Sequence, residues 1–336
     1  MESVAIPESA AEFLAGHVER VRRQWPKKRI VFPEGGDPRI VAAAERLARE
    51  GLVEPILVGK RPSGVSSGLQ FIDPEASPNT AKYAALYSER RSGRGLTEAE
   101  AVRTARRPLY FAPLMVAAGD ADGTVGGAST TSAHTVRAAL QSIGPAPGIH
   151  TVSGFFVIAL PDRSHGHRGL LLMADCAVVV DPTAAQLADI AIATAASAEA
   201  LLGTKPIVAL LSFSTKGSAR HPEVTKVVEA FKLVRARAPH LEVDGELQAD
   251  AALVEAVGRA KSPDSRVPGH ANTLIFPNLV SGNIGYKLTE WMAGGVAIGP
   301  LLQGLAKPAN DLSRACSPDE VYSVAVITAL QCANGQ

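Results

Sequence analysis

A chain of 336 residues, of which 46% are apolar and 20% charged, has the composition of a soluble globular protein and fits two α/β domains or one large one. Its net charge of +1 argues against sequence-independent nucleic-acid binding, which usually needs a strong basic excess. Apolar stretches such as GFFVIAL and LLLMADCAVVV are too short or too interrupted to cross a membrane, and the acidic N-terminus has no apolar signal region, which predicts a cytoplasmic protein.

The first 80 residues predict a helix followed by one βαβ unit. Residues 10–24 have apolar side chains near helical spacing and predict an amphipathic helix. Residues 29–59 read as strand, turn, helix and strand, which is about the length of a βαβ unit. Residues 61–78 are rich in Ser, Gly and Pro and predict a loop that contains a short strand.

Helical patterns follow at residues 81–91 and 97–106. The second pattern opens with Thr97 and Glu100, which have the spacing of a capping box. Residues 119–143 then predict a glycine-rich turn that leads into a helix.

Beyond the GPAPG segment at residues 144–148 the pattern changes, and this segment is the candidate domain boundary. Near-continuous apolar strands alternate with helices, which indicates a mostly parallel sheet covered on both faces. The strands are expected at residues 151–160, 169–180, 206–213, 241–245, 272–278 and 296–302, and the helices at residues 184–202, 223–237 and 283–292.

Residues 317–333 predict the last helix. Ser317 suits the N-cap, Pro318 the first helical position, and Glu320 lies three residues after the cap. Glu320 can therefore be a purely structural capping residue.

The residues before that cap are harder to explain as structural. A helix N-terminus attracts anions, Arg314 adds donors that match a phosphate, and Ser313 adds a hydroxyl. Cys316 is either a nucleophile, because helix N-termini lower the pKa of thiols, or a small buried residue. With Cys176 and Cys332 it makes only three scattered cysteines, too few for a disulfide framework or a four-cysteine zinc site.

The blocks IGPLLQGLAKPANDLSRACS, LLSFSTKGSARHPEV, DGELQADAALV, IFPNLVSGNIGYKL, MADCAVVVDPTAAQLADIA and RIVFPEGGDPRIVAAA resemble the phosphate acetyltransferase (phosphotransacetylase) family. The resemblance covers nearly the whole chain, from about residue 29 to residue 333. It implies transfer of an acetyl group between coenzyme A and phosphate, with acetyl-CoA and acetyl phosphate as the acetylated partners. It also implies a homodimer with no redox cofactor and no catalytic metal, in which coenzyme A is a substrate.

The same resemblance implies an α/β fold of the isocitrate/isopropylmalate dehydrogenase type, with two domains and mostly parallel sheets. Residues 1–147 and 299–336 would form one domain, which carries the terminal helix. Residues 148–298 would form the other, with the active-site cleft between them.

Carried over to this chain, the family's serine–arginine pair falls on Ser313 and Arg314. The base that takes the thiol proton falls on Glu320. The family usually has Asp at that position, so Asp319 is the alternative base, and Glu320 remains open to the capping interpretation.

The family's two arginines that bind coenzyme A or phosphate fall on Arg91 and Arg137. From the residues alone, Arg91 reads as part of a solvated basic turn and Arg137 as a helix-surface residue. Ser129 and Thr130 supply hydroxyls at the glycine-rich entry to a helix, which suits an acyl phosphate.

Two further loops follow predicted strands, where ligands bind in open α/β sheets. One carries Ser214 and Lys216 in STKGSAR, which lacks the spacing of a Walker loop. The other carries Asn283 and Lys287 at a helix entry. The family motif adds Asn310 as a substrate-binding residue.

The sequence leaves several alternative functions open. Within the fold these are a phosphate butyryltransferase, a ping-pong enzyme that acetylates Cys316, and a non-catalytic module that binds coenzyme A. A nicotinamide dehydrogenase is disfavoured because the chain has no Gly-x-Gly-x-x-Gly fingerprint. The HGHRG segment offers two histidines without a third metal ligand, and GDADGTVGG lacks the final glutamate of a calcium loop.

Overall fold

The computed structural model describes residues 6–333, which form two compact units. Unit 1 comprises residues up to Phe13 together with Ile149–Gly304, and unit 2 comprises Leu14–Gly148 together with the residues from Leu305 onward. The sequence placed the N-terminal residues and residues 299–304 with the terminal helix instead. Residues 299–304 lie in unit 1 because most of them belong to a strand of its sheet, and the N-terminal residues because the Ser9 hydroxyl donates to the Leu160 carbonyl at 2.7 Å.

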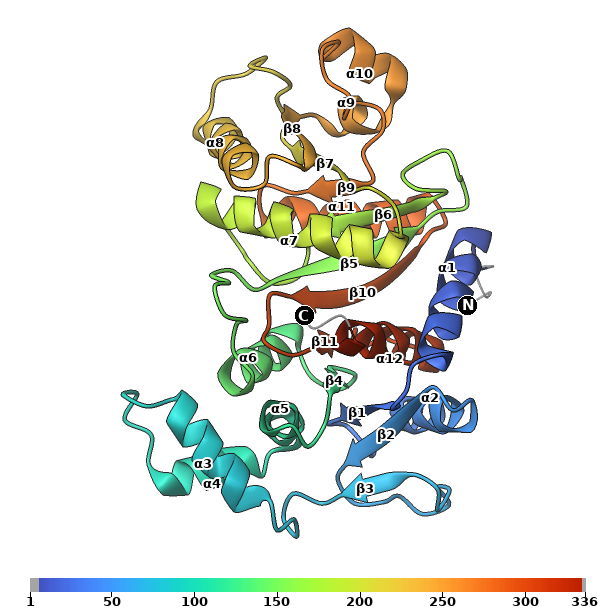
Figure 1. The fold of residues 1–336 in the computed structure, drawn as a ribbon, viewed down its shortest axis with the longest axis vertical. Helices are drawn as coiled ribbons and strands as arrows, with labels where there is room; N and C mark the ends of the chain where they lie inside the picture. Colours follow the sequence, from blue (N-terminus) through green and yellow to red (C-terminus); the bar gives the residue numbers. More distant parts are fainter. Residues whose placement is uncertain (1–5, 334–336) are drawn as a thin grey trace. The chain divides into compact units, whose positions relative to one another are not determined.

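Unit 2 is built on a five-stranded sheet in which every pair of neighbours is parallel. The strands lie in the order β11-β4-β1-β2-β3 (Figure 1). The chain therefore runs outward from β1 through β2 to β3 and returns to place β4 and β11 on the other side of β1. Their bounds are β1 Lys28–Phe32, β2 Val53–Val58, β3 Gln70–Ile72, β4 Gly123–Gly126 and β11 Ala309–Asp311.

Unit 2 contains several helices, some of which cover this sheet. The bounds are α1 Glu8–Arg22, which crosses from one unit to the other along the chain, α2 Pro38–Arg49, α3 Thr80–Arg90, α4 Glu98–Ala105, α5 Pro108–Ala118, α6 Ser132–Ser142 and α12 Pro318–Ala333. Helix α12 packs over β1, β4 and β11 beside α2, whereas α5 packs over β1, β2 and β4 beside α3 and α6. Residues 321–331 of α12 are buried, so this helix anchors the C-terminal segment in the unit.

Unit 1 contains a six-stranded sheet in the order β10-β5-β6-β9-β7-β8. Strand β5 is antiparallel to both of its neighbours, and the remaining pairs are parallel. The bounds are β5 Ser153–Ala159, β6 Leu170–Ala174, β7 Ile207–Leu211, β8 Glu242–Leu247, β9 Thr273–Ile275 and β10 Val296–Gln303. A mostly parallel α/β architecture is thus confirmed in both units.

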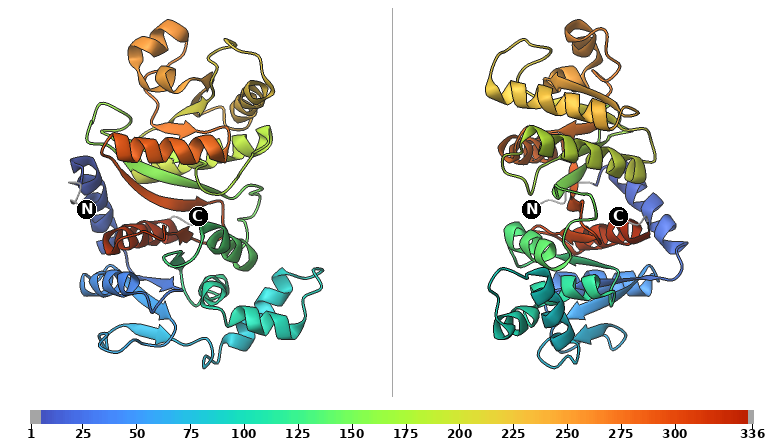
Figure 2. Two further views of the ribbon diagram at one scale, coloured as in Figure 1. Left: turned by 180° about the vertical axis from the view of Figure 1, so that it is seen from behind. Right: turned by 60° about the vertical axis from the view of Figure 1, so that its left-hand side comes forward.

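The helices of unit 1 are α7 Ala184–Leu202, α8 Pro222–Arg237, α9 Ala249–Leu253, α10 Glu255–Lys261 and α11 Leu279–Met292. Helices α7 and α11 lie on opposite faces of the six-stranded sheet, with α7 nearer the viewer in Figure 1 and α11 in the left view of Figure 2. By length and composition α7 could cross a membrane, but more than half of it is buried where it packs against α8, β6 and β9. It is therefore a core helix of this fold.

The long predicted elements are confirmed, including the βαβ unit, the helix at Ala184–Leu202 and both capping boxes. The strand predicted at residues 169–180 ends at Ala174, because the Asp175 carboxylate accepts the N–H groups of the next residues and turns the chain. The sequence did not predict strands β4 and β11 or helices α5, α9 and α10. Helix α5 is apolar nearly all round and so has no helical period to detect.

Candidate functional site

Three loops follow neighbouring strands of unit 2, and two of them carry predicted site residues. They leave the carboxyl ends of β1, β4 and β11, which are adjacent in the order β11-β4-β1. The chain changes direction between β1 and β4, so this is the topological switch point of the sheet. In open α/β sheets, ligands bind at such a point beyond the carboxyl ends of the strands.

The loop after β1 holds the loop after β4 through Glu34. The Glu34 carboxylate accepts the N–H groups of Gly127 at 2.9 Å, Ala128 at 3.0 Å and Ser129 at 2.9 Å. The hydroxyls of Ser129 and Thr130 donate to the same carboxylate at 3.1 and 3.2 Å. The predicted anion-binding turn is present, but in this structure its donors surround a carboxylate of the chain itself.

Arg39, in the first turn of α2, joins all three loops. Its guanidinium makes a bidentate pair with Asp37 at 2.7 and 3.0 Å and donates to the Ala128 carbonyl at 2.7 Å. It also donates to the carbonyls of Arg314 at 2.7 Å and Cys316 at 3.1 Å. Asp37 is the N-cap of α2, and its pair with Arg39 holds the pKa of its carboxyl below the ordinary value.

The loop after β11 presents Ser313 and Arg314 to solvent. It is a tight turn in which the Cys316 N–H donates to the Ser313 carbonyl at 2.9 Å and the Ala315 N–H to the Ser313 hydroxyl at 3.2 Å. Among the described residues of unit 2, the Arg314 guanidinium has no hydrogen-bond or ion-pair partner. The structure therefore keeps all five of its donors available to a ligand.

Glu320 forms the predicted capping box. Its carboxylate accepts the Ser317 N–H at 2.7 Å, and its own N–H donates to the Ser317 hydroxyl at 3.2 Å. The carboxylate is nevertheless exposed and lies six residues from Arg314, at the same end of α12. Asp319, the alternative base, pairs instead with Arg46 on α2 at 2.9 Å.

Cys316 is a poor nucleophile in this environment. Its side chain is only 3% exposed, and burial raises the pKa of its thiol to about 11 although Arg39 opposes the shift. At neutral pH the thiol is therefore protonated. This geometry favours the interpretation of Cys316 as a small buried residue.

The strand before this turn contains two fully buried polar residues. The Asn310 amide donates to Thr328 at 2.8 Å and Gln331 at 2.7 Å, both on α12, so it faces the core of the unit. Burial raises the pKa of the Asp311 carboxyl to about 6, and neither of its buried oxygens has a hydrogen-bond partner among residues 6–333. Both residues lie on β11, the strand that leads into the Ser313 turn.

Arg91 and Arg137 lie on neighbouring helices of unit 2. Arg91 is the partly exposed C-cap of α3, and Arg137 is exposed on α6, against which α3 packs. The Tyr87 hydroxyl donates to Gln141 at 2.9 Å and joins the two helices. Both arginines are accessible to a ligand.

In unit 1 the loop after β7 is also arranged around a carboxylate of the chain. Glu246, on β8, accepts the Ser214 hydroxyl at 2.9 Å and the Gly217 N–H at 2.7 Å. Ser214 is fully buried, so its hydroxyl serves the loop. Lys216 has a left-handed backbone with φ of 49°, which is strained for a residue other than glycine.

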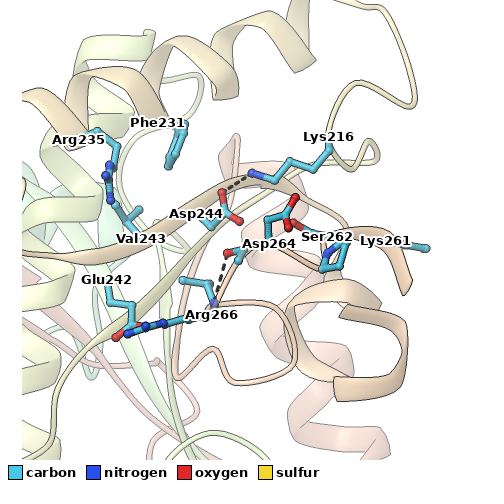
Figure 3. Close-up of a pocket in the computed structure, with 13 residues that line it drawn as sticks. Lys216, Phe231, Arg235, Glu242, Val243, Asp244, Lys261, Ser262, Asp264 and Arg266 are labelled. Carbon is cyan, nitrogen blue, oxygen red and sulfur yellow. Dashed lines mark hydrogen bonds and ion pairs between the residues drawn. The ribbon is translucent and has the colours of Figure 1, made fainter. Parts of the chain in front are cut away.

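Lys216 extends over a pocket of roughly 600 Å³ and pairs with Asp244 (Figure 3). The pocket lies between α8, the edge strand β8 and the loop after α10. It is lined by Lys216, Phe231, Arg235, Glu242, Val243, Asp244, Lys261, Ser262, Pro263, Asp264, Ser265, Arg266 and Val267. Its four basic and three acidic side chains nearly balance, so it is not simply an anion site. Of the predicted site residues only Lys216 lines it.

Asn283 and Lys287 lie on α11, which begins at Leu279, so both are inside the helix and not at its entry as predicted. The Asn283 amide donates to the Cys176 carbonyl at 3.2 Å. Lys287 is exposed, with its ammonium 4.9 Å from the centre of the Tyr286 ring.

Unit 2 thus gathers Ser313, Arg314, Glu320, Ser129 and Thr130 on the loops and helix ends beyond one edge of its sheet. Sequence reasoning missed Glu34 and Arg39, although both lie in the turn that follows the first predicted strand. Their position after a strand in a βα turn was the available signal. Among residues 6–333, no group of three or more His, Cys, Asp or Glu side chains is arranged to hold a metal ion.

Comparisons with known proteins identify the family of this chain. The family model described as phosphate acetyl/butaryl transferase matches residues 13–329. The phosphate acetyltransferase of Paracoccus denitrificans is 49% identical over 90% of this chain and 95% of its own length. That of Clostridium acetobutylicum is 46% identical over 92% of this chain and 96% of its own length.

A solved phosphotransacetylase from Streptococcus pyogenes has a TM-score of 0.90 with 42% identity, covering 97% of this chain and 99% of that one. A putative 4-hydroxythreonine-4-phosphate dehydrogenase from Salmonella typhimurium matches 91% of this chain and 99% of its own with a TM-score of 0.52 and 13% identity, which shows the shared dehydrogenase-like fold. The chain is therefore an acyltransferase by class. It belongs to the phosphate acetyl/butaryl transferase family, which confirms the resemblance noted in its sequence.

Proposed function

We propose that this protein catalyses the reversible reaction of acetyl-CoA with phosphate to give acetyl phosphate and coenzyme A. The observation that carries the proposal is the exposed Arg314 guanidinium, which is unpaired within the described part of unit 2. It lies next to Ser313 on the turn before α12, with the Glu320 carboxylate at the first turn of that helix. Relatives named phosphate acetyltransferase at 43–49% identity support the acetyl group as the substrate.

In the proposed mechanism the coenzyme A thiol attacks acetyl phosphate directly. A free thiol has a pKa of about 8.5, so little thiolate exists at neutral pH. Glu320 takes the thiol proton as sulfur bonds to the acetyl carbon. The carbonyl oxygen becomes negative, the carbon–oxygen bond to phosphate then breaks, and phosphate leaves with that electron pair. Arg314 and Ser313 stabilise the negative charge as it moves from the carbonyl oxygen to phosphate.

The remaining predicted residues act as binding groups. We propose that Arg91 and Arg137 bind the phosphates of coenzyme A, with Ser129, Thr130, Lys216, Asn283 and Lys287 as further contacts. Ser214 and Asn310 support the loops that carry the site, since their side chains are buried and bonded within the fold. Because the Cys316 thiol is buried and protonated, the kinetics are expected to be sequential and Cys316→Ala to stay active.

A thiol-release assay tests the proposal. Coenzyme A should appear from acetyl-CoA only when phosphate or arsenate is present, and butyryl-CoA should react more slowly. Faster turnover of butyryl-CoA would instead identify a phosphate butyryltransferase. Binding of coenzyme A with no phosphate-dependent thiol release would identify a non-catalytic module.

Glu320→Gln separates the base from the cap. Glutamine at this position can still accept the Ser317 N–H, so the capping box survives and the melting temperature should change little. The variant cannot take a proton, and kcat should fall by about 10²–10⁴-fold.

Ser317→Ala is the matched control for Glu320→Gln. It removes the cap hydroxyl and should cost about 1 kcal/mol of stability while it leaves the carboxylate in place and kcat within a few-fold of wild type. If Glu320→Gln keeps full turnover, or if both variants lose activity equally, Glu320 is a cap and not the base.

The proposal includes a homodimer, supported by a row of exposed apolar side chains on α11. Val280, Ile284, Leu288, Trp291 and Met292 follow one another at helical spacing and are 53–81% exposed. Exposed apolar stripes of this kind mark interaction surfaces. Sedimentation at micromolar concentration should give a dimer mass for wild type and a monomer mass for Leu288→Glu, whereas a wild-type monomer would refute it.

The three free cysteines suit the reducing cytoplasm, where we propose that the protein acts. Recovery of the activity in a membrane or extracellular fraction of the cell would contradict that location.

A further inference from the structure

Arg39 uses all five of its guanidinium donors within unit 2. One Nη donates to the carbonyls of Arg314 and Cys316, the other Nη donates to Asp37 and to the Ala128 carbonyl, and Nε donates to Asp37. An arginine side chain has five N–H groups, so none remains for a substrate. Arg39 therefore cannot act as a further phosphate-binding arginine without giving up a contact.

The Ser313–Cys316 turn has little other support. Ser313, Arg314 and Ala315 are exposed, and the turn's own hydrogen bonds are the two to the carbonyl and hydroxyl of Ser313. Two of its carbonyls, on Arg314 and Cys316, point to Arg39. The peptide group that follows Arg314 and the one that follows Cys316 are thus fixed by a residue about 275 positions earlier in the chain.

The same guanidinium also fixes the loop after β4. Its bond to the Ala128 carbonyl lies next to the N–H groups that donate to Glu34. Asp37 holds Arg39 from the other side with both carboxylate oxygens and is itself tied to the start of α2. One side chain therefore sets the relative position of the loops that follow β1, β4 and β11.

We propose that Arg39 is a positioning residue for the acyl transfer: it fixes the backbone of the Ser313–Cys316 turn so that Arg314 meets the reacting phosphoryl group in a fixed orientation. The inference rests on the proposed function and names a residue that acts through another and does not touch substrate. Lysine cannot replace it, because a single ammonium lacks the planar fork that reaches the carboxylate and three carbonyls together.

Arg39→Lys tests this assignment in the full-length protein. Because a displacement of about 1 Å can cost roughly 10²-fold in rate, kcat should fall by about 10–100-fold. The KM for acetyl-CoA should change less than about 3-fold, because Arg39 has no free donor for the substrate. Arg49→Lys, an exposed change on the same helix, is the control and should keep wild-type kinetics.

The double variant Arg39→Lys/Arg314→Gln distinguishes positioning from general damage. If Arg39 acts through Arg314, the double variant should turn over about as fast as Arg314→Gln alone, since contributions made through one group are not additive. Unchanged kcat in Arg39→Lys, a raised KM with normal kcat, or losses that simply add in the double variant would each overturn the proposal.

A readout that needs no activity separates this proposal from the proposed function. Hydrogen exchange in peptides that cover residues 309–320 should be faster in Arg39→Lys than in wild type and in Arg49→Lys, because the turn loses its anchor. An inactive wild type would defeat the proposed function alone, whereas unchanged exchange would defeat the positioning role. If Arg39→Lys does not fold, Asp37→Asn replaces it, since it keeps a cap oxygen and removes the charge that orients Arg39.

Discussion

Replacing Arg314 by glutamine should lower kcat by about 10²–10³-fold, the usual effect of losing one donor to a developing oxyanion. The Arg314 guanidinium is exposed and unpaired within the described part of unit 2, so its loss leaves no buried partner unsatisfied and should not unfold the protein. The effect should therefore be catalytic. Steady-state kinetics with acetyl-CoA and phosphate measure it, together with the melting temperature.

The expected pattern is a loss in kcat with a KM for acetyl-CoA close to wild type. An interaction made mainly in the transition state lowers kcat, whereas one made equally in the ground state raises KM. Arg49→Gln, at an exposed position of α2, is the matched control and should be neutral. An Arg314→Gln enzyme as fast as wild type would remove Arg314 from the mechanism.

The large elements of the fold could be predicted because they are long and regularly patterned. Helix α7 begins and ends where the sequence places it, since a capping box opens it and a left-handed Gly203 closes it. The missed strands are short and lack an apolar pattern: β4 is Gly-Thr-Val-Gly and β11 is Ala-Asn-Asp. They are strands because parallel neighbours pair with them, and a pairing across the fold leaves no signal in three or four residues.

The functional site was predictable only in part, for a different physical reason. Glycines, backbone N–H groups and hydroxyls at a helix entry indicate that an anion binds there. They do not indicate whether that anion belongs to a substrate or is a carboxylate of the protein itself. At Gly127–Thr130 the anion is Glu34, about 95 residues earlier, and at Ser214–Gly217 it is Glu246. Each carboxylate accepts hydrogen bonds from donors that the local sequence pattern would assign to a substrate. The order of the strands in the sheet decides which carboxylate lies beside such a loop. A local sequence pattern does not contain that order.

Gly127 and Asp311 lie in close contact at the carboxyl ends of β4 and β11, where the candidate site lies. We therefore expect Gly127→Ala to be among the most damaging single changes. Gly127 has φ of 114°, which strains any residue with a side chain. An added Cβ would lie 2.2 Å from an Asp311 carboxylate oxygen and 2.8 Å from the backbone N and O of Leu312. Asp311 is fully buried, and the backbone beside it leads straight into the Ser313 turn.

Overpacking typically costs 1–3 kcal/mol and a strained backbone about as much again, so unit 2 should lose roughly 3 kcal/mol or more of its free energy of unfolding. Urea unfolding followed by circular dichroism measures this loss, and kcat should fall because the clash pushes on the turn that carries Arg314. Gly51→Ala is the matched control, since Gly51 also has a positive φ of 61° but an added Cβ there meets nothing within 4 Å. The difference in the free energy of unfolding between the two variants measures the clash with Asp311 and Leu312. Equal losses would mean that the loops after β4 and β11 are not packed this closely.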